Sequence, residues 1–265
     1  MMFNQGSYMH KTIVITGASS GIGNALAHWL ANAGHHIIAV GRNEQALQAL
    51  HQLHPDHVEI IVADITSYQD RQKIADILPT DQEGICLVHN AGISQPNLIA
   101  NLTEEEWDQH DLVNTKAPLF LTKLLLPHLK NGGRVLHVST GLAHRALAGF
   151  ATYGMTKAAF YMLKEYCNIE FEKQDIIFGS AMPGVVDTPI QAQLRSHDNK
   201  SFPSVDIFKG FQQRGELLSS TTAAKFLAWL LIDSEREQFV KGDWDIYDTT
   251  HHQYWADAGE VKLRS

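Results

Sequence analysis

The stretch TIVITGASSGIG, from Thr12 to Gly23, decides the fold of this 265-residue chain. Residues of high strand propensity lead directly into three glycines, and a segment of helical period follows. Glycines let the backbone turn tightly and approach a pyrophosphate, whose charge then faces the helix N-terminus. The stretch therefore predicts the first strand–loop–helix unit of a dinucleotide-binding domain. The alternative is an ordinary tight turn between a strand and a helix.

The alternation of strand and helix continues along the chain. Short, nearly continuous apolar runs predict strands buried on both faces, as in parallel sheets. These runs are residues 12–16, 37–40, 58–63, 85–89, 135–139, 176–181 and, more weakly, 244–247. Segments of helical period lie between them, at residues 21–32, 44–53, 68–78, 104–129, 153–173 and 221–232. We therefore expect an α/β fold: a single-domain, Rossmann-type, doubly wound parallel sheet of about seven strands with helices on both faces.

Three segments of the single domain, residues 1–265, depart from this rhythm. Residues 1–10 form an N-terminal extension, and residues 249–265 form a polar and aromatic tail. Residues 190–218 mix Pro, Ser, Asp, Lys and Phe without a clear period. Because a long irregular loop inside a compact domain is usually functional, we expect this segment to cover the substrate.

Composition argues against several classes of protein. The chain is 44% hydrophobic and carries a net charge of −8 with no long basic run, which disfavours disorder, nucleic-acid binding and membrane-surface binding. No run of about 18 apolar residues predicts a membrane span, and the first eleven residues lack the apolar core of a signal peptide. Cys86 and Cys167 are too few for a disulfide framework and lie in apolar runs. We expect reduced core cysteines in a cytoplasmic protein.

Fifteen histidines raise the question of a metal site. His51, His54 and His57 are spaced by three, but Pro55 interrupts any helix that would align them. No cluster of cysteines or carboxylates joins them at ligand spacing, so we expect no metal. We expect these histidines to be solvated at the surface, together with two adjacent pairs, His35-His36 and His251-His252.

The glycine spacing here is G-x-x-x-G-x-G, which differs from the G-x-G-x-x-G motif of longer dehydrogenases. It resembles the T-G-x-x-x-G-x-G motif of the short-chain dehydrogenase/reductase family. The resemblance runs from about Lys11 to Asp248, with further motifs in register. They are Asp64, Asn90-Ala91-Gly92, Asn114, Tyr153 with Lys157 (Y-x-x-x-K), and Pro183-Gly184 with Thr188.

In that family these motifs surround a nicotinamide dinucleotide. The resemblance implies that Asp64 contacts the adenine, that Asn90-Ala91-Gly92 packs beside the cofactor, and that Pro183, Gly184 and Thr188 hold the nicotinamide carboxamide. The expected cofactor-binding residues are Gly17, Ser19, Ser20, Gly21, Ile22, Gly23, Arg42, Asp64, Ile65, Asn90, Ala91, Gly92, Tyr153, Lys157, Pro183, Gly184, Val186 and Thr188.

The end of the second strand predicts the type of nicotinamide cofactor. An NAD-binding enzyme usually places a carboxylate there to bind the ribose 2′-OH. Residues 39–43 contain no carboxylate but do contain Arg42, which can bind a 2′-phosphate in a bidentate manner. Ser19, Ser20 and Asn43 could add neutral hydrogen bonds. We therefore predict NADP(H) rather than NAD, the alternative being a solvated arginine near a helix start.

Tyr153 and Lys157 are four residues apart, so they share one face of a helix. A free tyrosine has a pKa of about 10, and an adjacent ammonium with an oxidised nicotinamide should lower it. Tyr153 is therefore the predicted general acid and base. The resemblance further implies that Lys157 binds the nicotinamide ribose and that Asn114 holds a water in the proton relay.

The family also places a serine thirteen residues before the tyrosine, where it binds the substrate oxygen. Here Thr140 occupies that position and Ser139 precedes it. Threonine supplies the same O–H donor, so we favour Thr140 and keep Ser139 as the alternative.

The predicted function is transfer of a hydride between NADP(H) and a small carbonyl or alcohol. Residues 139–157 resemble the sepiapterin reductase and benzil reductase branch, which implies a dicarbonyl or a planar ring ketone. A 3-oxoacyl thioester is the other substrate class considered. A non-catalytic NADP-binding sensor or scaffold is disfavoured because Tyr153 and Lys157 are both present.

Two further expectations concern the surroundings of the site. Residues 104–129 and 153–173 match the helices through which the family usually forms homodimers or homotetramers. The residues expected to line the substrate pocket are Ala143, His144, Phe150, Phe202, Phe208, Phe211, Leu217 and Leu218.

Overall fold

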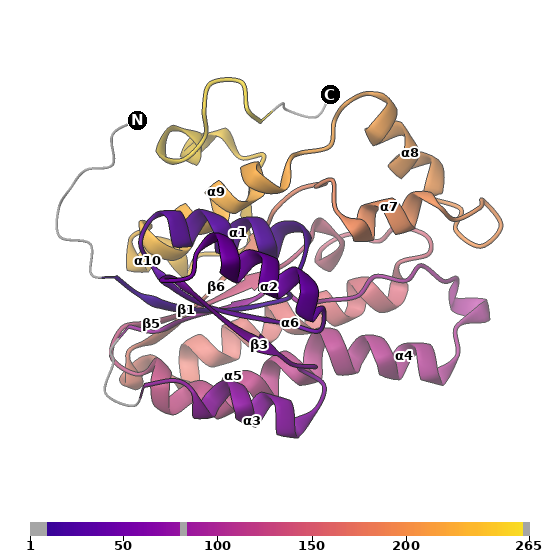
Figure 1. The fold of residues 1–265 in the computed structure, drawn as a ribbon. Helices are drawn as coiled ribbons and strands as arrows, with labels where there is room; N and C mark the ends of the chain where they lie inside the picture. The colour runs from indigo at the N-terminus through magenta and orange to yellow at the C-terminus, as the bar shows by residue number, and fades with distance from the viewer. Residues whose placement is uncertain (1–9, 80–83, 262–265) are drawn as a thin grey trace.

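A seven-stranded parallel sheet lies at the centre of the computed structural model, which describes residues 10–79 and 84–261 (Figure 1). Its strand order is β3-β2-β1-β4-β5-β6-β7. The strands are β1 (Thr12–Thr16), β2 (His36–Gly41), β3 (Val58–Val62), β4 (Cys86–His89), β5 (Gly133–Val138), β6 (Ile176–Met182) and β7 (Trp244–Asp245). The order reverses between β1 and β4, which is where doubly wound sheets bind their ligands. The predicted fold class is confirmed.

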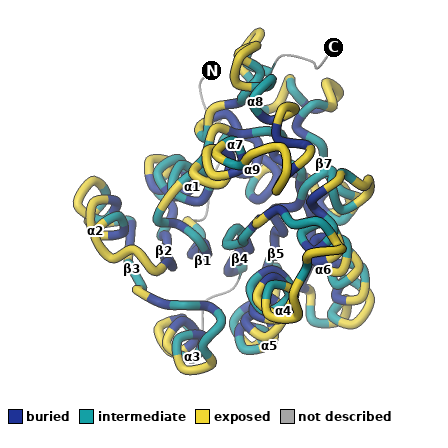
Figure 2. Tube along the Cα trace, turned by 90° about the vertical axis from the view of Figure 1, so that its right-hand side faces the viewer, coloured by how far each residue is buried: buried dark blue, intermediate teal, exposed yellow. Residues whose placement is uncertain are grey.

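Helices cover both faces of this sheet (Figure 2). The first layer contains α1 (Gly21–Asn32), α2 (Glu44–Leu53) and α9 (Ser220–Ile232). The second layer contains α3 (Tyr68–Asp76), α4 (Glu104–Asp111), α5 (Ala117–Leu129) and α6 (Ala151–Glu170). A short helix, α10 (Arg236–Phe239), packs near β6.

The apolar runs are buried on both faces, as expected for inner parallel strands. Ile13 and Ile15 of β1 pack in the core beneath α1 and α9, whereas Val14 packs in the core on the opposite face. Cys86 belongs to the first core and Cys167 to the second, so the prediction of buried, reduced cysteines is confirmed.

The helix predicted over residues 104–129 is interrupted by a π-helical turn, Leu112–Lys116, between α4 and α5. Such turns concentrate at functional sites. The predicted capping box of Thr103 and Glu106 starts α4. The helix predicted over residues 153–173 instead spans Ala151–Glu170 and is followed by a short 3-10 turn, Glu172–Gln174.

The expectation that residues 190–218 are irregular is wrong. They contain most of α7 (Pro189–Arg195) and all of α8 (Val205–Gln213), which lie beside each other beyond the sheet (Figure 1). The Thr188 side chain caps the N-terminus of α7. Leu194 of α7 and Phe208 of α8 belong to the same buried hydrophobic cluster. The tail also has structure, since Thr249–Tyr254 forms a 3-10 helix.

The solvated state expected for the paired histidines is wrong for His35 and His251, which are only 4% and 3% exposed. The Lys11 backbone N–H donates to His35 Nδ1, and Trp255 Nε1 donates to His251 Nδ1. Within the described ranges, no group of three or more His, Cys, Asp or Glu side chains is placed to hold a metal. No helix in that part of the chain combines the length and apolar character needed to cross a membrane.

Candidate active site

A cavity of about 1040 Å³ opens where the strands of the sheet end. Its lining residues include those that follow β1, β2, β3, β4 and β5, together with the end of β6. This volume slightly exceeds the range of about 300–1,000 Å³ for small-molecule pockets. The cavity spans the point at which the strand order reverses, so the fold places it where a dinucleotide binds.

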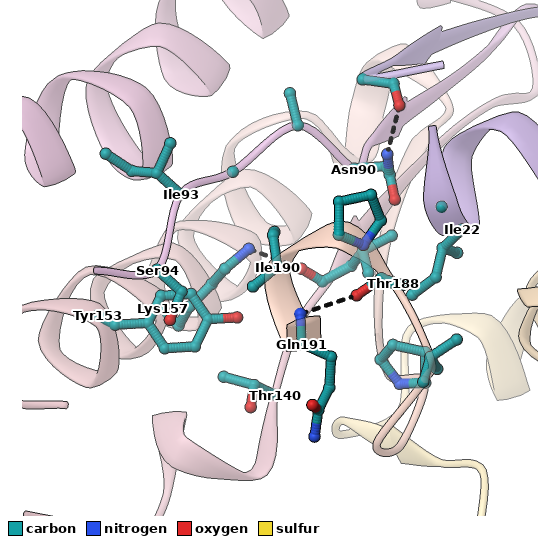
Figure 3. A pocket seen from close by; sticks show the side chains of 18 of the residues that line it. Ile22, Asn90, Ile93, Ser94, Thr140, Tyr153, Lys157, Thr188, Ile190 and Gln191 are labelled. Carbon is teal, nitrogen blue, oxygen red and sulfur yellow. Dashed lines mark hydrogen bonds between the residues drawn. The ribbon is translucent and has the colours of Figure 1, made fainter. Parts of the chain in front are cut away.

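The glycine loop is packed so tightly that no side chain would fit at Gly17 or Gly23. Gly17 has φ +69°, and a Cβ there would lie 2.9 Å from Asn90 Nδ2. The Asn90 amide donates to Thr16 O at 2.9 Å and to Gly17 O at 3.2 Å; Figure 3 shows Asn90 beside this loop. A Cβ at Gly23 would lie 2.5 Å from Gly17 O. The loop is therefore held against the end of β4 as an open backbone cradle.

The cavity brings together every predicted cofactor-binding residue except Gly23, and all of these residues lie in the described ranges. Gly23 instead allows α1 to approach the loop closely. The sequence reasoning missed Gly41, whose Cβ would lie 3.1 Å from Ser19 Oγ. The missing side chain lets the end of β2 approach the loop.

Arg42 lies at the outer end of the cavity, with its side chain 75% exposed. Its Nη1 is 3.9 Å from Asp64 Oδ2. The other Asp64 oxygen accepts hydrogen bonds from the Thr66 backbone N–H and hydroxyl. The backbone cradle, the exposed guanidinium and the carboxylate that follows β3 fit a nicotinamide dinucleotide.

Tyr153 lies in the first turn of α6, and its hydroxyl points into the cavity near Thr140 (Figure 3). Burial raises the pKa of Tyr153 to about 12, and a hydrogen bond with Thr140 acts in the opposite direction. The Tyr153 phenol of the polypeptide therefore stays protonated in the neutral pH range. The predicted lowering of this pKa includes the charge of an oxidised nicotinamide and stays a prediction.

Lys157 follows Tyr153 by one helical turn, but its ammonium is directed elsewhere. Its Nζ donates to Val138 O at 2.8 Å and lies 5.9 Å from the centre of the Tyr153 ring. Burial lowers the pKa of Lys157 to about 8, and the Asp243 carboxylate opposes this change. The Lys157 ammonium is therefore hydrogen-bonded to Val138 O rather than to the Tyr153 hydroxyl.

Ser139 and Thr140 are adjacent but have different partners. Ser139 Oγ donates to Asp243 Oδ2 at 3.0 Å, and His144 Nε2 lies 2.8 Å from the same oxygen. Thr140 instead bonds with Tyr153. This arrangement favours Thr140 as the hydroxyl that binds substrate. Asp243 was not found from the sequence, because no motif marks it.

Asn114 lies in the π-helical turn and is only 1% exposed. Its Oδ1 accepts from the Ile93 backbone N–H, and its Nδ2 donates to Ile93 O and Thr156 Oγ1. Asn114 does not line the cavity, so it joins the segment after β4 to α6. Its predicted role in holding a water stays a prediction.

The substrate end of the cavity has an aromatic wall. Phe150, Phe208 and Phe211 line it, as expected. Phe202 is fully buried behind this wall, with its ring centre 5.0 Å from that of Phe150. The other expected lining residues are absent from the described lining: Ala143, His144, Leu217 and Leu218. His144 pairs with Asp243, and Leu218 forms a β-bridge with Val186.

The fold and this arrangement of residues agree with comparisons to known proteins. The model of the short chain dehydrogenase family matches residues 11–199. The chain belongs to the short-chain dehydrogenase family. Members of this family are oxidoreductases that bind nicotinamide cofactors, so this short-chain dehydrogenase is an oxidoreductase of the same kind.

Two bacterial relatives are similar over most of their length. An uncharacterized oxidoreductase of Staphylococcus aureus (strain USA300) is 30% identical over 201 residues, 74% of this chain and 87% of the relative. An uncharacterized oxidoreductase of Staphylococcus epidermidis is 33% identical over 186 residues, 68% of this chain and 80% of the relative. Among solved structures, the KRED1-Pglu enzyme superposes with a TM-score of 0.80 and 26% identity, covering 86% of this chain and 98% of that one.

Proposed function

We propose that this protein reduces a small carbonyl compound with NADPH and that Tyr153 is the proton donor. The observation that carries the proposal is the partly buried Tyr153 phenol, which is hydrogen-bonded to Thr140 inside the cavity that the glycine loop lines. The Tyr153 hydroxyl, which can protonate a carbonyl oxygen, and the Thr140 hydroxyl, which can bind it, therefore lie together at one end of a cavity large enough for a dinucleotide.

The cofactor preference is argued from Arg42. Its guanidinium is exposed and can form bidentate hydrogen bonds with a phosphate, whereas a carboxylate in its place would repel one. Asp64 lies close enough to orient the guanidinium through a weak, exposed ion pair. The cradle of Gly17, Ser19 and Ser20 would hold the pyrophosphate.

NADPH held by the cradle would supply a hydride to the carbonyl carbon. The Thr140 and Tyr153 hydroxyls orient the carbonyl oxygen, which gains negative charge as the hydride arrives. Tyr153 then donates its proton to this oxygen. The positive charge of Lys157 favours the resulting phenolate, because opposite charges attract strongly in a buried site.

An NADPH-oxidation screen tests this function. Diketones, pterins, quinones and 3-oxoacyl thioesters cover the carbonyl classes that the sequence resemblance suggests. Tyr153→Phe removes one oxygen and preserves ring packing, so it should lower turnover by about 10²–10⁴-fold while retaining NADPH binding. Normal turnover in Tyr153→Phe would refute the proposed proton donor.

We also propose a homodimer or homotetramer formed through α5 and α6. These helices expose several large apolar side chains: Leu119, Phe120, Met155, Met162, Tyr166 and Ile169. Multi-angle light scattering tests this assembly. A monomer at micromolar concentration would refute it.

A further inference from the structure

Two buried polar groups at the substrate end of the cavity have no partner among the described residues. They are Ser94 Oγ and Gln191 Nε2, in side chains that are 5% and 4% exposed as residues. Both residues line the cavity with Tyr153 and Thr140, as Figure 3 shows. A buried donor without a partner destabilises the folded protein, because it has lost its hydrogen bonds to water. Two such donors in one cavity therefore point to a ligand that accepts hydrogen bonds.

The orientation of the Gln191 amide is fixed by the protein. Gln191 Oε1 accepts a hydrogen bond from Arg195 Nη1, and arginine can only donate. Arg195 is in turn 3.4 Å from Asp187 Oδ1. These contacts leave the NH₂ group of Gln191, rather than its oxygen, for a ligand. The ligand atom that meets Gln191 must therefore be an acceptor.

Arg145 adds a positive charge at the same end. A Cβ at Gly141 would lie 3.1 Å from Arg145 Nη2, so the guanidinium lies against the residue that follows Thr140. Arg145 lines the cavity and has no hydrogen bond or ion pair with any residue in the described ranges. The other arginines of those ranges do have protein partners: Arg42, Arg71, Arg134, Arg195, Arg214 and Arg236.

The carboxylates that line the cavity are not placed to satisfy Arg145. Asp64 lies beside Arg42 at the outer end. Asp245 Oδ1 accepts a hydrogen bond from the Tyr247 backbone N–H at the end of β7. The substrate end therefore combines a cation with two neutral donors, next to an apolar wall that includes Leu147 and Phe150.

We propose that the substrate is a short oxo acid, whose carboxylate binds Arg145 and whose oxygens accept hydrogen bonds from Ser94 and Gln191. A guanidinium matches a carboxylate in both charge and geometry. The position of Arg145 against Gly141 keeps the carboxylate a few atoms from the reacting carbonyl, as in a 2-oxo or 3-oxo acid. This inference rests on the proposed carbonyl reduction.

The reaction leaves the carboxylate unchanged. The carbonyl carbon takes a hydride from NADPH, and its oxygen takes the proton from Tyr153. The products are a hydroxy acid and NADP⁺. Arg145, Ser94 and Gln191 take no part in bond making, so they determine specificity rather than chemistry.

Matched substrates test this assignment in the whole enzyme. We would compare 2-oxobutanoate and acetoacetate with their methyl esters, which keep the carbonyl and lose the charge. The acids should have a kcat/KM at least about 10-fold higher than the esters, the effect of one ion-paired contact worth about 1.4 kcal/mol. Arg145→Gln should bring this ratio close to one, and Gln191→Leu should lower kcat/KM for the acids. Lys130→Gln removes an exposed charge outside the cavity and should leave the ratio unchanged.

A binding measurement separates this inference from the proposed reduction. Calorimetry with the NADPH complex of Tyr153→Phe reports acid and ester binding without turnover. Tighter binding of the acids supports the oxo-acid site even if the unmodified enzyme reduces neither compound, a result that would refute the reduction alone. Equal binding of acid and ester, no binding of either, or an acid preference that persists in Arg145→Gln would overturn the inference. A preference for neutral diketones would overturn it as well.

Discussion

The Ser139 hydroxyl donates a hydrogen bond to Asp243 Oδ2 at 3.0 Å, although the two residues are 104 positions apart. The Asp243 side chain is only 4% exposed, and the same oxygen is paired with His144. Ser139 is thereby held facing β7, while its neighbour Thr140 bonds with Tyr153. The two adjacent hydroxyls thus have different partners, Asp243 and Tyr153.

The first prediction ranks these two hydroxyls. Thr140→Val preserves shape but removes the donor, so kcat should fall by about 10²-fold or more, as when one oxyanion donor is deleted. Ser139→Ala should reduce kcat much less. It should instead lower the free energy of unfolding by about 1–3 kcal/mol, because Asp243 loses a buried partner. Steady-state kinetics and urea unfolding measure the two effects, and the opposite kinetic ranking would assign the substrate hydroxyl to Ser139.

The second prediction concerns the pH dependence of reduction. Tyr153, with a pKa of about 12, stays protonated throughout the neutral range. Lys157, with a pKa of about 8, loses its charge within the accessible range. The kcat for reduction should therefore be level below pH 8 and decrease above it, since a neutral lysine stabilises the phenolate less. Rates at saturating NADPH between pH 6 and 10 test this, and Lys157→Met should abolish the step near pH 8.

The third prediction concerns Arg42. The protein should bind NADPH at least about 10-fold more tightly than NADH, a difference of about 1.4 kcal/mol. Arg42→Ala should weaken NADPH binding alone, because only NADPH carries the 2′-phosphate. Fluorescence titration of both cofactors measures the difference. Equal affinities in the unmodified protein would contradict the NADP preference.

The fourth prediction is that the buried charge of Lys157 lowers stability. Its pKa is about 8 in the folded protein, below the 10.5 of a free lysine. Below pH 8 the lysine is charged in both states, and burying that charge costs up to about 3 kcal/mol, from 1.36 kcal/mol per pKa unit. Lys157→Met should therefore be more stable than the unmodified protein at pH 7. The difference should shrink between pH 8 and 10.5, as the folded lysine becomes neutral first. The measurement is the urea midpoint of Lys157→Met and of the unmodified protein at pH 7 and at pH 10. The same difference between the two proteins at both pH values would contradict the prediction.

The fifth prediction concerns two histidines beneath the site. Burial lowers the pKa of His89 to about 3 and also holds the pKa of His137 well below its usual value. Because the unfolded chain takes up these protons near pH 6.5 and the folded chain does not, stability is lost progressively below pH 6.5. Moving from pH 7 to pH 5 should cost about 2 kcal/mol for His89 at 1.36 kcal/mol per pH unit, and His137 should add a loss in the same direction. Between pH 7 and pH 5, the free energy of unfolding of His89→Gln, measured with urea, should therefore decrease less than that of the unmodified protein. An equal decrease in both proteins would contradict the low pKa of His89.

The sequence predicted the sheet because its strands are buried on both faces, which gives continuous apolar runs such as Ile13 to Ile15. It predicted the cradle because Gly17 requires φ +69° and leaves no room for a Cβ. It missed α7 and α8 because their buried residues, Leu194 and Phe208 among them, are separated by polar and turn-forming residues. Each of these helices is short and buries only one face, so its apolar residues do not repeat often enough to show a helical period in the sequence.

The omissions at the site have a different cause. The Tyr153 pKa depends on the depth at which the ring is buried and on the direction of the Lys157 ammonium, and neither follows from their spacing of four. Asp243 reaches Ser139 only because β7 pairs with β6 beside β5. The unsatisfied donors of Ser94 and Gln191 become visible only when every neighbouring atom is placed. Such properties belong to the assembled tertiary structure.

The aromatic wall also constrains how this enzyme can diverge. Phe150 immediately precedes α6, and its ring centre lies 5.0 Å from that of Phe202, 5.5 Å from that of Phe208 and 6.1 Å from that of Tyr153. The Phe150 ring therefore contacts both the residues that shape the substrate end and Tyr153, the proposed proton donor. A duplicated gene that acquires a new substrate by replacing Phe202 or Phe208 would disturb its own chemistry at the same time. Evolution of specificity is freer at cavity-facing residues outside this cluster, such as Arg145.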